Sequence, residues 1–186
     1  MENFKYQKYW QLDVSEKKNP TDDQLKFLLE NAIKIRTMAD VNKFVAILMG
    51  SDSDLATMQP AVDVLGGFGI TCEVNIKSAH RTPEETATYV RDADARGCEV
   101  FIAGAGLAAH LAGAIAAQTL KPVIGVPMQA GPLNGVDALL STVQMPGGIP
   151  VACVAIGKTG AKNAGYLAAQ MMALGDPGLA EKVRAE

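Results

Sequence analysis

The residues best suited to chemistry are a histidine and an arginine that stand side by side, His80 and Arg81, after a short apolar run. An imidazole exchanges protons near neutral pH, and a guanidinium offers a planar fork of donors that fits a phosphate. Ser78 adds a hydroxyl two residues before the histidine. Because a lone histidine in a loop often serves structure alone, a structural role is the alternative to a proton-transfer site beside an anion site.

A second polar cluster, Gly50-Ser51-Asp52-Ser53-Asp54, follows an earlier apolar run. We expect a helix to begin at Leu55, and the free N–H groups at a helix N-terminus favour a phosphate or a carboxylate. The same serine and aspartate side chains could instead only cap that helix, and both interpretations stay open. The segment is not a Walker A loop, because the Gly-Lys-Ser/Thr ending is absent, and no Gly-x-Gly-x-x-Gly motif follows this run.

A segment of small residues, from Gly104 to Leu111, follows the third apolar run. Its glycines and alanines let a ligand approach the backbone and leave N–H groups available. His110 lies in the helix predicted for Ala108 to Gln118, where a buried, hydrogen-bonded histidine is the plainer interpretation. Residues Pro127 to Gly135 are rich in turn formers and are expected to reach over the same edge of the fold.

These clusters need a scaffold that brings the ends of several strands together. From Phe44 onward, short apolar runs alternate with longer Ala-rich stretches, which predicts strands separated by helices. The predicted strands are Phe44 to Met49, Thr71 to Ile76, Val100 to Ala103, Val123 to Val126 and Val151 to Ile156. Their continuous apolarity predicts a parallel sheet of about five strands covered on both faces, a three-layer α/β/α sandwich. Ligands of such sheets bind beyond the carboxyl ends of the strands, which the polar clusters follow.

The first 43 residues differ in composition from the rest. They carry 15 charged side chains and half of the aromatic residues. An amphipathic helix is predicted over Asp22 to Thr37, after the start signal Pro20-Thr21. We therefore expect an N-terminal arm, 1–43, followed by a single catalytic α/β domain, 44–186. A helix this short seldom folds alone, so the arm is expected to dock on the body or on a neighbouring subunit.

Composition narrows the class of protein. The 186 residues have a net charge of -3 and 48% apolar side chains, which fits one globular domain without a basic field for nucleic acid or an anionic membrane. Cys72, Cys98 and Cys153 show no metal-ligand spacing, and the N-terminus lacks a secretory pattern. We expect a reduced, cytoplasmic protein without metal. Val100 to Leu120 lacks charge, but its alanines, glycines and His110 favour a buried strand and helix over a membrane span.

Charge is scarce between Glu99 and Asp176, where only six charged side chains occur. The helices predicted over Ala108 to Gln118 and Ala161 to Leu174 are therefore expected to have no wide polar face to offer to water. We expect them to pack between the subunits of a homo-oligomer. An unusually thick core within one chain is the alternative.

Four motifs occur in order along the chain, and together they resemble the PurE family. They are Gly50-Ser51-Asp52-Ser53-Asp54 with Met58, Ser78-Ala79-His80-Arg81-Thr82-Pro83, Gly104-Ala105-Gly106 to His110-Leu111, and Gln144-Met145-Pro146 to Ala155-Ile156-Gly157-Lys158. The likeness runs from Phe44 to Leu174 and is greatest to the class I members, the N5-carboxyaminoimidazole ribonucleotide mutases of purine biosynthesis. Class II carboxylases typically show Lys where Arg81 stands and lack the Gly-Ala-Gly to His-Leu run, which favours the mutase.

The resemblance implies a flavodoxin-like sheet, a homo-octamer and a reaction without metal or cofactor. The family moves a carboxyl group from the exocyclic nitrogen of an aminoimidazole ribonucleotide to ring carbon C4. His80 would carry the protons, because a single imidazole can donate one and collect another. The substrate-binding residues implied are Arg81, Ser53 and Ser78 for the 5'-phosphate, Asp54 for the ribose, Ser51, Ala79, Ala105 and Gly106 for the migrating carboxylate or CO2, and also His110 and Leu111.

The chain departs from the family pattern at three places. Leu107 stands where the family usually has a second Gly, Ala112 where it usually has Pro, and Ala130-Gly131-Pro132 replaces a commoner Ser-containing loop. Leu107 would either narrow the carboxylate pocket or shift the start of the helix. Two other functions remain compatible with the residues: a carboxylase that uses CO2 directly on aminoimidazole ribonucleotide, and a non-catalytic nucleotide-binding module on the same fold.

Overall fold

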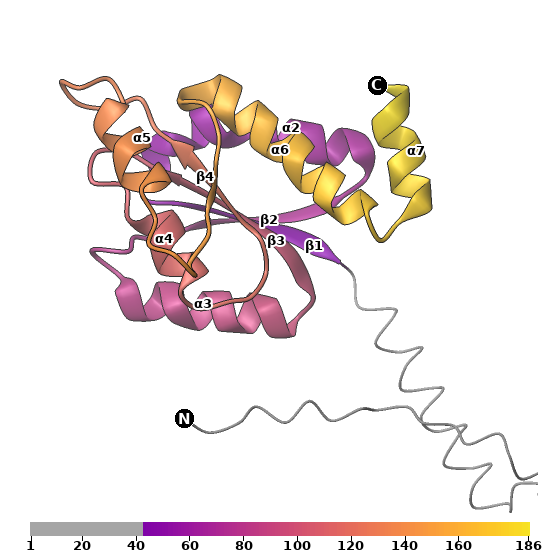
Figure 1. Cartoon of the computed structure of the whole chain (residues 1–186), viewed down its shortest axis with the longest axis horizontal. Coiled ribbons are helices and arrows are strands. Elements are labelled where there is room, and N and C mark those ends of the chain that lie inside the picture. Colours follow the sequence, from indigo (N-terminus) through magenta and orange to yellow (C-terminus); the bar gives the residue numbers. More distant parts are fainter. Residues whose placement is uncertain (1–42) are drawn as a thin grey trace, which may run out of the picture. The chain divides into compact units, whose positions relative to one another are not determined.

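Five parallel strands form one sheet in the order β2-β1-β3-β4-β5 in the computed structural model, which describes residues 43–186 (Figure 1). Most of the arm and the helix predicted over 22–37 lie outside the described residues. The strands are β1 (Phe44–Met49), β2 (Thr71–Ile76), β3 (Cys98–Ala105), β4 (Val123–Pro127) and β5 (Ala152–Cys153). This order is that of a flavodoxin-like doubly wound fold, as predicted, with the chain reversing its direction across the sheet between β1 and β3.

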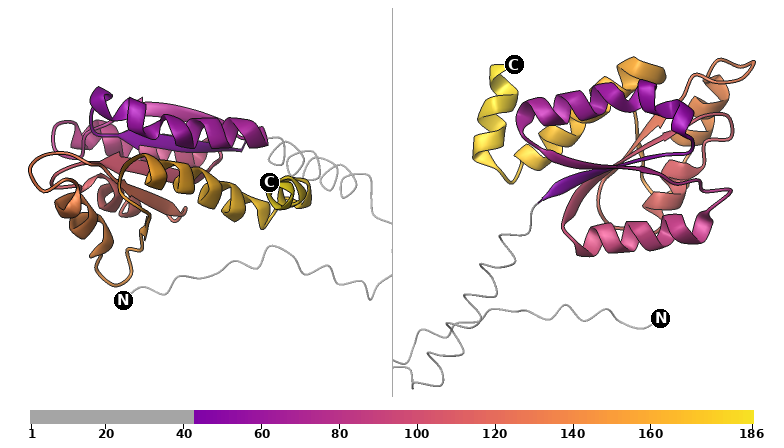
Figure 2. Two further views of the ribbon diagram at one scale, coloured as in Figure 1. Left: turned by 90° about the horizontal axis from the view of Figure 1, so that it is seen from above. Right: turned by 180° about the vertical axis from the view of Figure 1, so that it is seen from behind.

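Helices cover both faces of the sheet (Figures 1 and 2). On one face lie α2 (Leu55–Phe68) and α6 (Gly157–Ala173), and α7 (Pro177–Ala185) packs on α6. The opposite face carries α3 (Pro83–Ala95) and α4 (Leu111–Ala116). The last helix, α5 (Val136–Val143), packs against β4, where a side chain in place of Gly125 would overlap Thr142. A single 3-10 turn, η1 (Asp52–Asp54), precedes α2.

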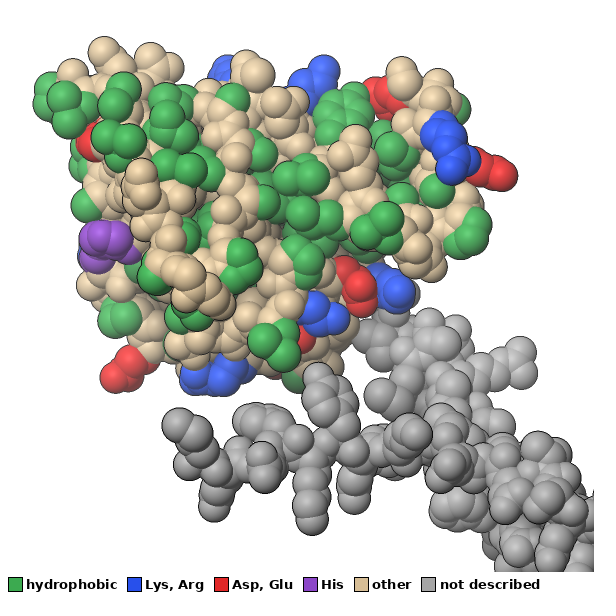
Figure 3. Space-filling model, viewed as in Figure 1, with side chains coloured by type: hydrophobic (Ala, Val, Ile, Leu, Met, Phe, Trp, Pro, Cys, Tyr) green, Lys and Arg blue, Asp and Glu red, His purple; other side chains and the backbone are tan. Residues whose placement is uncertain are grey.

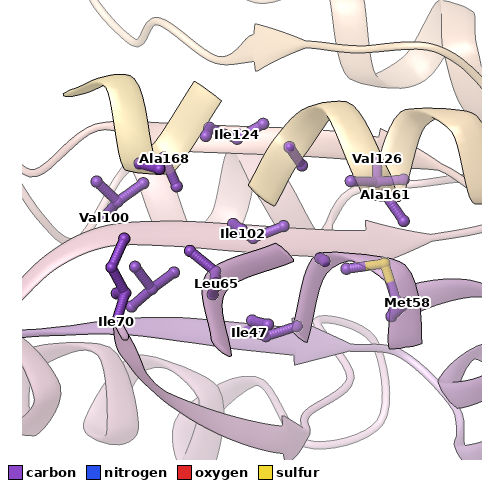
Figure 4. Close-up of a cluster of buried hydrophobic side chains, with 14 of the residues drawn as sticks. Ile47, Met58, Leu65, Ile70, Val100, Ile102, Ile124, Val126, Ala161 and Ala168 are labelled. Carbon is purple, nitrogen blue, oxygen red and sulfur yellow. The ribbon is translucent and has the colours of Figure 1, made fainter. Parts of the chain in front are cut away.

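Strand β1 shows why the apolar runs are continuous. Val45, Ile47 and Met49 pack under α2 and α6, where Figure 4 shows Ile47 beside Leu65 and Ile102. The alternate residues of the strand point to the other face and pack with α3 and α4. All six side chains of the strand are buried, because both faces of the central strands are covered. This part of the prediction is confirmed.

The edges of the sheet differ from the prediction. Strand β2 has a single neighbour, and Val74 and Ile76 are 41% and 55% exposed, so both faces are covered only in the centre of the sheet. Strand β5 spans Ala152–Cys153 rather than Val151 to Ile156. Helix α4 begins at Leu111 rather than at Ala108. Two helices, α5 and α7, were not predicted.

Helix α6 has a polar face, contrary to the prediction. The expected lack of such a face was the reason given for an oligomer, and for this helix that reason was wrong. Its buried positions are glycines and alanines that pack on α2 of the same chain, with the backbone of Ala61 close to Gly165. Its exposed positions are polar: Lys158, Thr159, Lys162, Asn163 and Gln170. The scarcity of charge in α6 therefore reflects close helix packing within one chain, and the assembly itself stays a prediction.

The uncharged stretch Val100 to Leu120 is divided between strand β3, a loop and the short helix α4. Across residues 43–186, every helix is too short or too polar to cross a membrane.

Candidate functional site

The polar clusters meet in one cavity of about 410 Å³ at the carboxyl ends of β1, β2 and β3. This is the switch point of the sheet, where the fold leaves a crevice for a ligand. Every site residue predicted from the sequence lines it: Ser51, Ser53, Asp54, Ser78, Ala79, His80, Arg81, Ala105, Gly106, His110 and Leu111. Gly50, Leu107, Ala108 and Ala130 complete the wall.

A larger cavity, of about 880 Å³, lies at the start of β4. Its wall is mostly apolar and contains neither a histidine nor an arginine, although Asp94 and Lys121 reach it. The smaller cavity is the candidate site because it combines an imidazole, a guanidinium and a carboxylate at the ligand-binding edge of the sheet.

The residues that follow β1 cap the turn η1 and also line the cavity. Ser51 is the N-cap of η1, with its Oγ accepting from the N–H of Ser53 at 3.3 Å, and the Oγ of Ser53 donates to the same atom at 2.9 Å. Asp54 stands at the N-cap position of α2 but makes no capping hydrogen bond. The two interpretations of this cluster therefore apply to different residues, since Ser51 caps while the carboxylate of Asp54 is left for the cavity.

Burial is the main cause that raises the pKa of Asp54 above its ordinary value, and the charge of Asp52 adds to it. A backbone hydrogen bond at Ser51 works in the opposite direction. A carboxylate held partly out of water gains from any ligand hydroxyl that donates to it.

The wall after β2 is a tight loop closed by Thr82. The Oγ1 of Thr82 accepts from the N–H of Ser78 at 3.1 Å and donates to its carbonyl at 3.3 Å. The N–H of Arg81 donates to the Oγ of Ser78 at 3.2 Å. Thr82 is the N-cap residue of α3 and Pro83 its first residue, as predicted, but the hydroxyl of Thr82 serves the loop and makes no capping bond. These bonds fix the backbone that presents His80 and Arg81.

Arg81 reaches across to the neighbouring strand. One of its terminal nitrogens, Nη2, donates to the carbonyl of Gly50 at 2.8 Å, which ties the β2 loop to the β1 loop. None of the ion pairs between described residues includes Arg81. The remaining donors of this planar cation are available at the cavity, where they suit a phosphate.

His80 and His110 are in direct contact in the wall of the cavity. The Nε2 of His80 lies 2.6 Å from the Nδ1 of His110, and the two rings are nearly perpendicular, with an interplanar angle of 89°. Only one hydrogen fits between the two nitrogens, so one ring donates and the other accepts. The interpretation of His110 as a buried residue inside a helix was wrong, because the residue is exposed and precedes the first residue of α4.

The segment after β3 offers backbone donors. The N–H groups of Gly106, Leu107 and Ala108 make no hydrogen bond to any described residue. Leu107 has a φ of +56°, in the left-handed region that costs a residue with a side chain about 1–2 kcal/mol. Successive free N–H groups around a left-handed residue form a concavity that binds anions. These free N–H groups are compatible with the predicted contact between the Gly106 backbone and a carboxylate, which stays a prediction.

The loop after β4 completes the wall. A Cβ on Gly106 would lie 3.1 Å from the Cβ of Ala130, so the loop would have to shift by a few tenths of an ångström to accept it. The sequence interpretation noted this loop for its turn formers without assigning it a site residue. Across residues 43–186, no group of three or more His, Cys, Asp or Glu side chains has the arrangement of a metal site.

Comparisons with known proteins agree along most of the chain. Residues 44–186 match a family model described as AIR carboxylase. The chain is 55% identical over 140 residues to the N5-carboxyaminoimidazole ribonucleotide mutase of Thermotoga maritima, covering 75% of this chain and 81% of that protein. It is 56% identical over 147 residues to the protein of that name from Synechocystis, covering 79% and 82%. The crystal structure of Treponema denticola PurE aligns with a TM-score of 0.70 and 32% identity, over 77% of this chain and 88% of that one.

Proposed function

The chain belongs to the AIR carboxylase family, and we infer that it is an N5-carboxyaminoimidazole ribonucleotide mutase of purine biosynthesis whose proton carrier is His80. The observation that carries the mechanism is the pair of imidazoles at 2.6 Å beside Arg81 in a single cavity. An isomerisation that needs one proton given and one proton removed fits an imidazole held next to an anchored nucleotide.

The reaction proceeds in two halves that balance in atoms and protons. In the first half, an imidazolium at His80 donates a proton to the exocyclic nitrogen, the bond from nitrogen to the carboxyl carbon breaks, and CO2 and aminoimidazole ribonucleotide remain in the cavity. In the second half, C4 attacks CO2 and forms a carbon–carbon bond. The proton left on C4 returns to His80, so that the cycle ends with no net proton change.

His110 is the positioning partner of His80 in this account. Because the two rings share one hydrogen, His110 fixes which nitrogen of His80 faces its partner and holds the ring at the cavity edge. Both residues follow strands that flank β1, which supports a site assembled from two loops rather than from one motif.

The nucleotide is anchored by polar side chains of the same cavity. Arg81 binds the 5'-phosphate together with the hydroxyls of Ser53 and Ser78, since a planar cation and hydroxyl donors match phosphate oxygens. Asp54 accepts hydrogen bonds from the ribose hydroxyls, and this interaction offsets the cost of its burial.

The migrating carboxyl group is held by small residues. Ser51, Ala79 and Ala105, with the free N–H groups from Gly106 to Ala108, surround the place where it moves, and Leu111 closes the wall. Small apolar walls exclude water, which keeps CO2 from escaping or hydrating before C4 attacks it.

The proposal includes a homo-oligomer, of the octameric kind that the family resemblance implies, in the cytoplasm. Its support is an apolar surface on α5 and the turn before it, where four large side chains are about half exposed: Leu133, Val136, Leu140 and Val143. Figure 3 shows apolar side chains gathered over the end of the domain that carries α5. A surface of this kind is covered when copies associate. The three cysteines are free thiols, which suits a reducing compartment.

Two substrates offered separately to the purified full chain test the function. We expect N5-carboxyaminoimidazole ribonucleotide to be converted to 4-carboxy-5-aminoimidazole ribonucleotide without added bicarbonate. Conversion of only aminoimidazole ribonucleotide with bicarbonate would overturn the mutase in favour of the carboxylase. Tight binding of the nucleotide with no turnover of either substrate at any pH would leave a non-catalytic binding module.

A further inference from the structure

One residue of the cavity wall holds a backbone conformation that its side chain makes costly. Leu107 has a φ of +56°, although leucine has no local hydrogen bond of its own to stabilise that region. Its side chain is 52% exposed, so burial in the core does not offset the strain. A strained residue persists where its surroundings impose the conformation, and such residues gather at sites that hold a ligand.

The side chain of Leu107 points at the loop that follows β4. Its Cδ2 atom lies against Gly131, so closely that a Cβ on Gly131 would be 2.6 Å from it. Gly131 itself has a φ of +64° and belongs to the loop 129–135, whose residues 131–134 are exposed and which projects beside α5 (Figure 1). Leu107 therefore joins the wall after β3 to the wall after β4 by an apolar contact.

The two ends of this loop are fixed independently of Leu107. At one end, the N–H of Met128 donates to the carbonyl of Ala105 at 2.8 Å. At the other end, a Cβ on Gly135 would meet the side chain of Ile156 and the carbonyl of Met128. Between these ends, residues 129–134 make a single hydrogen bond to a described residue outside the loop. The N–H of Val136, the first residue of α5, donates to the carbonyl of Leu133. The tip of the loop has apolar contacts alone to the facing wall.

We propose that Leu107 is a positioning residue that holds the Gln129–Gly135 loop, and with it Ala130, over the carboxyl-transfer end of the cavity. The left-handed backbone does two things at once, since it aims the side chain at Gly131 and leaves the adjacent N–H groups unpaired at the cavity. The inference rests on the proposed function in one respect: a loop held in place retains CO2 between the two halves of the reaction, because a closed site excludes water.

Hydrogen–deuterium exchange of the full chain tests the contact without reference to catalysis. In Leu107→Ala we expect the hydrogen-bonded amides of the loop, those of Asn134 and Val136, to exchange several-fold faster than in the wild type, while α6 keeps its exchange rate. Leu174→Ala is the matched control. This substitution removes the same atoms from a leucine that is 91% exposed at the end of α6. Equal exchange of the loop in Leu107→Ala and the wild type would overturn the proposal.

Loss of CO2 during turnover tests whether the loop retains CO2 in the cavity. With N5-carboxyaminoimidazole ribonucleotide as substrate, we expect Leu107→Ala to release several-fold more aminoimidazole ribonucleotide per carboxylated product than the wild type or Leu174→Ala. Leu107→Gly relieves the strain and is expected to raise the melting temperature while leaking like Leu107→Ala, and Leu107→Met restores retention. If Leu107→Gly retained CO2 as well as the wild type, the side chain would have no positioning role. A wild type that forms no carboxylated product would instead refute the proposed function, and loop exchange would still decide on the contact.

Discussion

Two polar regions on the same sheet use their charged groups in opposite ways. Away from the cavity, Glu73 of β2 accepts from both terminal nitrogens of Arg96, at 2.5 and 2.9 Å, and from the hydroxyl of Tyr89 at 2.9 Å. Arg96 also donates to Asp92 at 2.6 Å. The hydrogen bonds from Arg96 hold the pKa of Glu73 below its ordinary value, and burial with the nearby Glu73 carboxylate raises the pKa of Tyr89. Every member of this group finds its partner within the protein.

The cavity leaves its groups without such partners. Arg81 has one carbonyl acceptor among the described residues, and burial raises the pKa of Asp54. The side chains of His80 and His110 hydrogen-bond to each other and to no other residue within 43–186. The contrast indicates that the Glu73 group serves the fold, and we propose that the cavity groups gain their partners from a ligand. Substitutions in the two regions should therefore separate activity from stability.

The largest effect is expected from His80→Asn. Asparagine keeps a polar side chain but cannot move protons, so turnover should fall by about 10²–10⁴-fold, the range usual for a lost general acid–base group. Steady-state kinetics with N5-carboxyaminoimidazole ribonucleotide measure the loss. Since His80 is exposed, the melting temperature should stay at the wild-type value. Turnover within a few-fold of the wild type would remove His80 from the chemistry.

Arg81→Ala should come next and act on the Michaelis constant. A hydrogen bond to a charged group contributes about 1.5–3 kcal/mol, which corresponds to roughly a 10- to 150-fold rise in KM. Arg96→Ala is the matched control, because it removes the same side chain from the other region. An equal rise in KM for both variants would abolish the distinction between the two regions.

The reverse pattern is expected when stability is measured. Arg96→Ala should lower the free energy of unfolding by about 1 kcal/mol or less, because the pair with Glu73 is partly exposed and screened by solvent. The lowered pKa of Glu73 gives the direction with pH. The ion pair with Glu73 stabilises the folded state fully above the ordinary pKa of 4.5. This stabilisation is lost as the pH falls through the lower pKa that Glu73 has in the folded protein. Denaturant titrations near pH 7 and pH 3 should show the difference between variant and wild type shrinking in acid.

The smallest effect is a gain in stability for Asp54→Asn. Burial raises the pKa of Asp54, so the charged carboxylate destabilises the folded state. This destabilisation is absent at a pH below the ordinary pKa of 3.8 and complete above the raised pKa. Removing the charge should stabilise the ligand-free protein slightly at pH 7 and have no effect in strong acid, while nucleotide binding weakens. Thermal melts at pH 7 and in strong acid measure the change in stability. A lower stability of the variant at pH 7 would contradict the view that Asp54 lacks a stabilising partner in the ligand-free cavity.

The central strands and the composition of the site could be predicted because local pattern determines them. Strands β1 and β2 begin and end where the apolar runs do. The polar clusters share a cavity because parallel strands end at one edge of the sheet. The register that sets β3 next to β1 depends on contacts far apart in sequence, so the meeting of His80 with His110, 30 residues away, was beyond a local pattern.

Local propensity also failed where tertiary contacts override it. Ala108 and Ala109 are good helix formers, yet the N–H of Ala109 donates to Ser141 of α5 at 3.0 Å and the helix starts only at Leu111. The left-handed backbone at Leu107 is a second such case, since a leucine gives no sign of it. Leu107 and Ala108 lie in the cavity wall, where tertiary contacts rather than propensity set the backbone.

Calorimetric titration of the carboxylated product nucleotide into His80→Asn and Arg81→Ala tests most directly whether one side chain performs the chemistry while its neighbour anchors the ligand. The account predicts that the inactive His80→Asn binds within a few-fold of the wild type and that Arg81→Ala binds far more weakly. Loss of binding in His80→Asn together with wild-type binding in Arg81→Ala would contradict it.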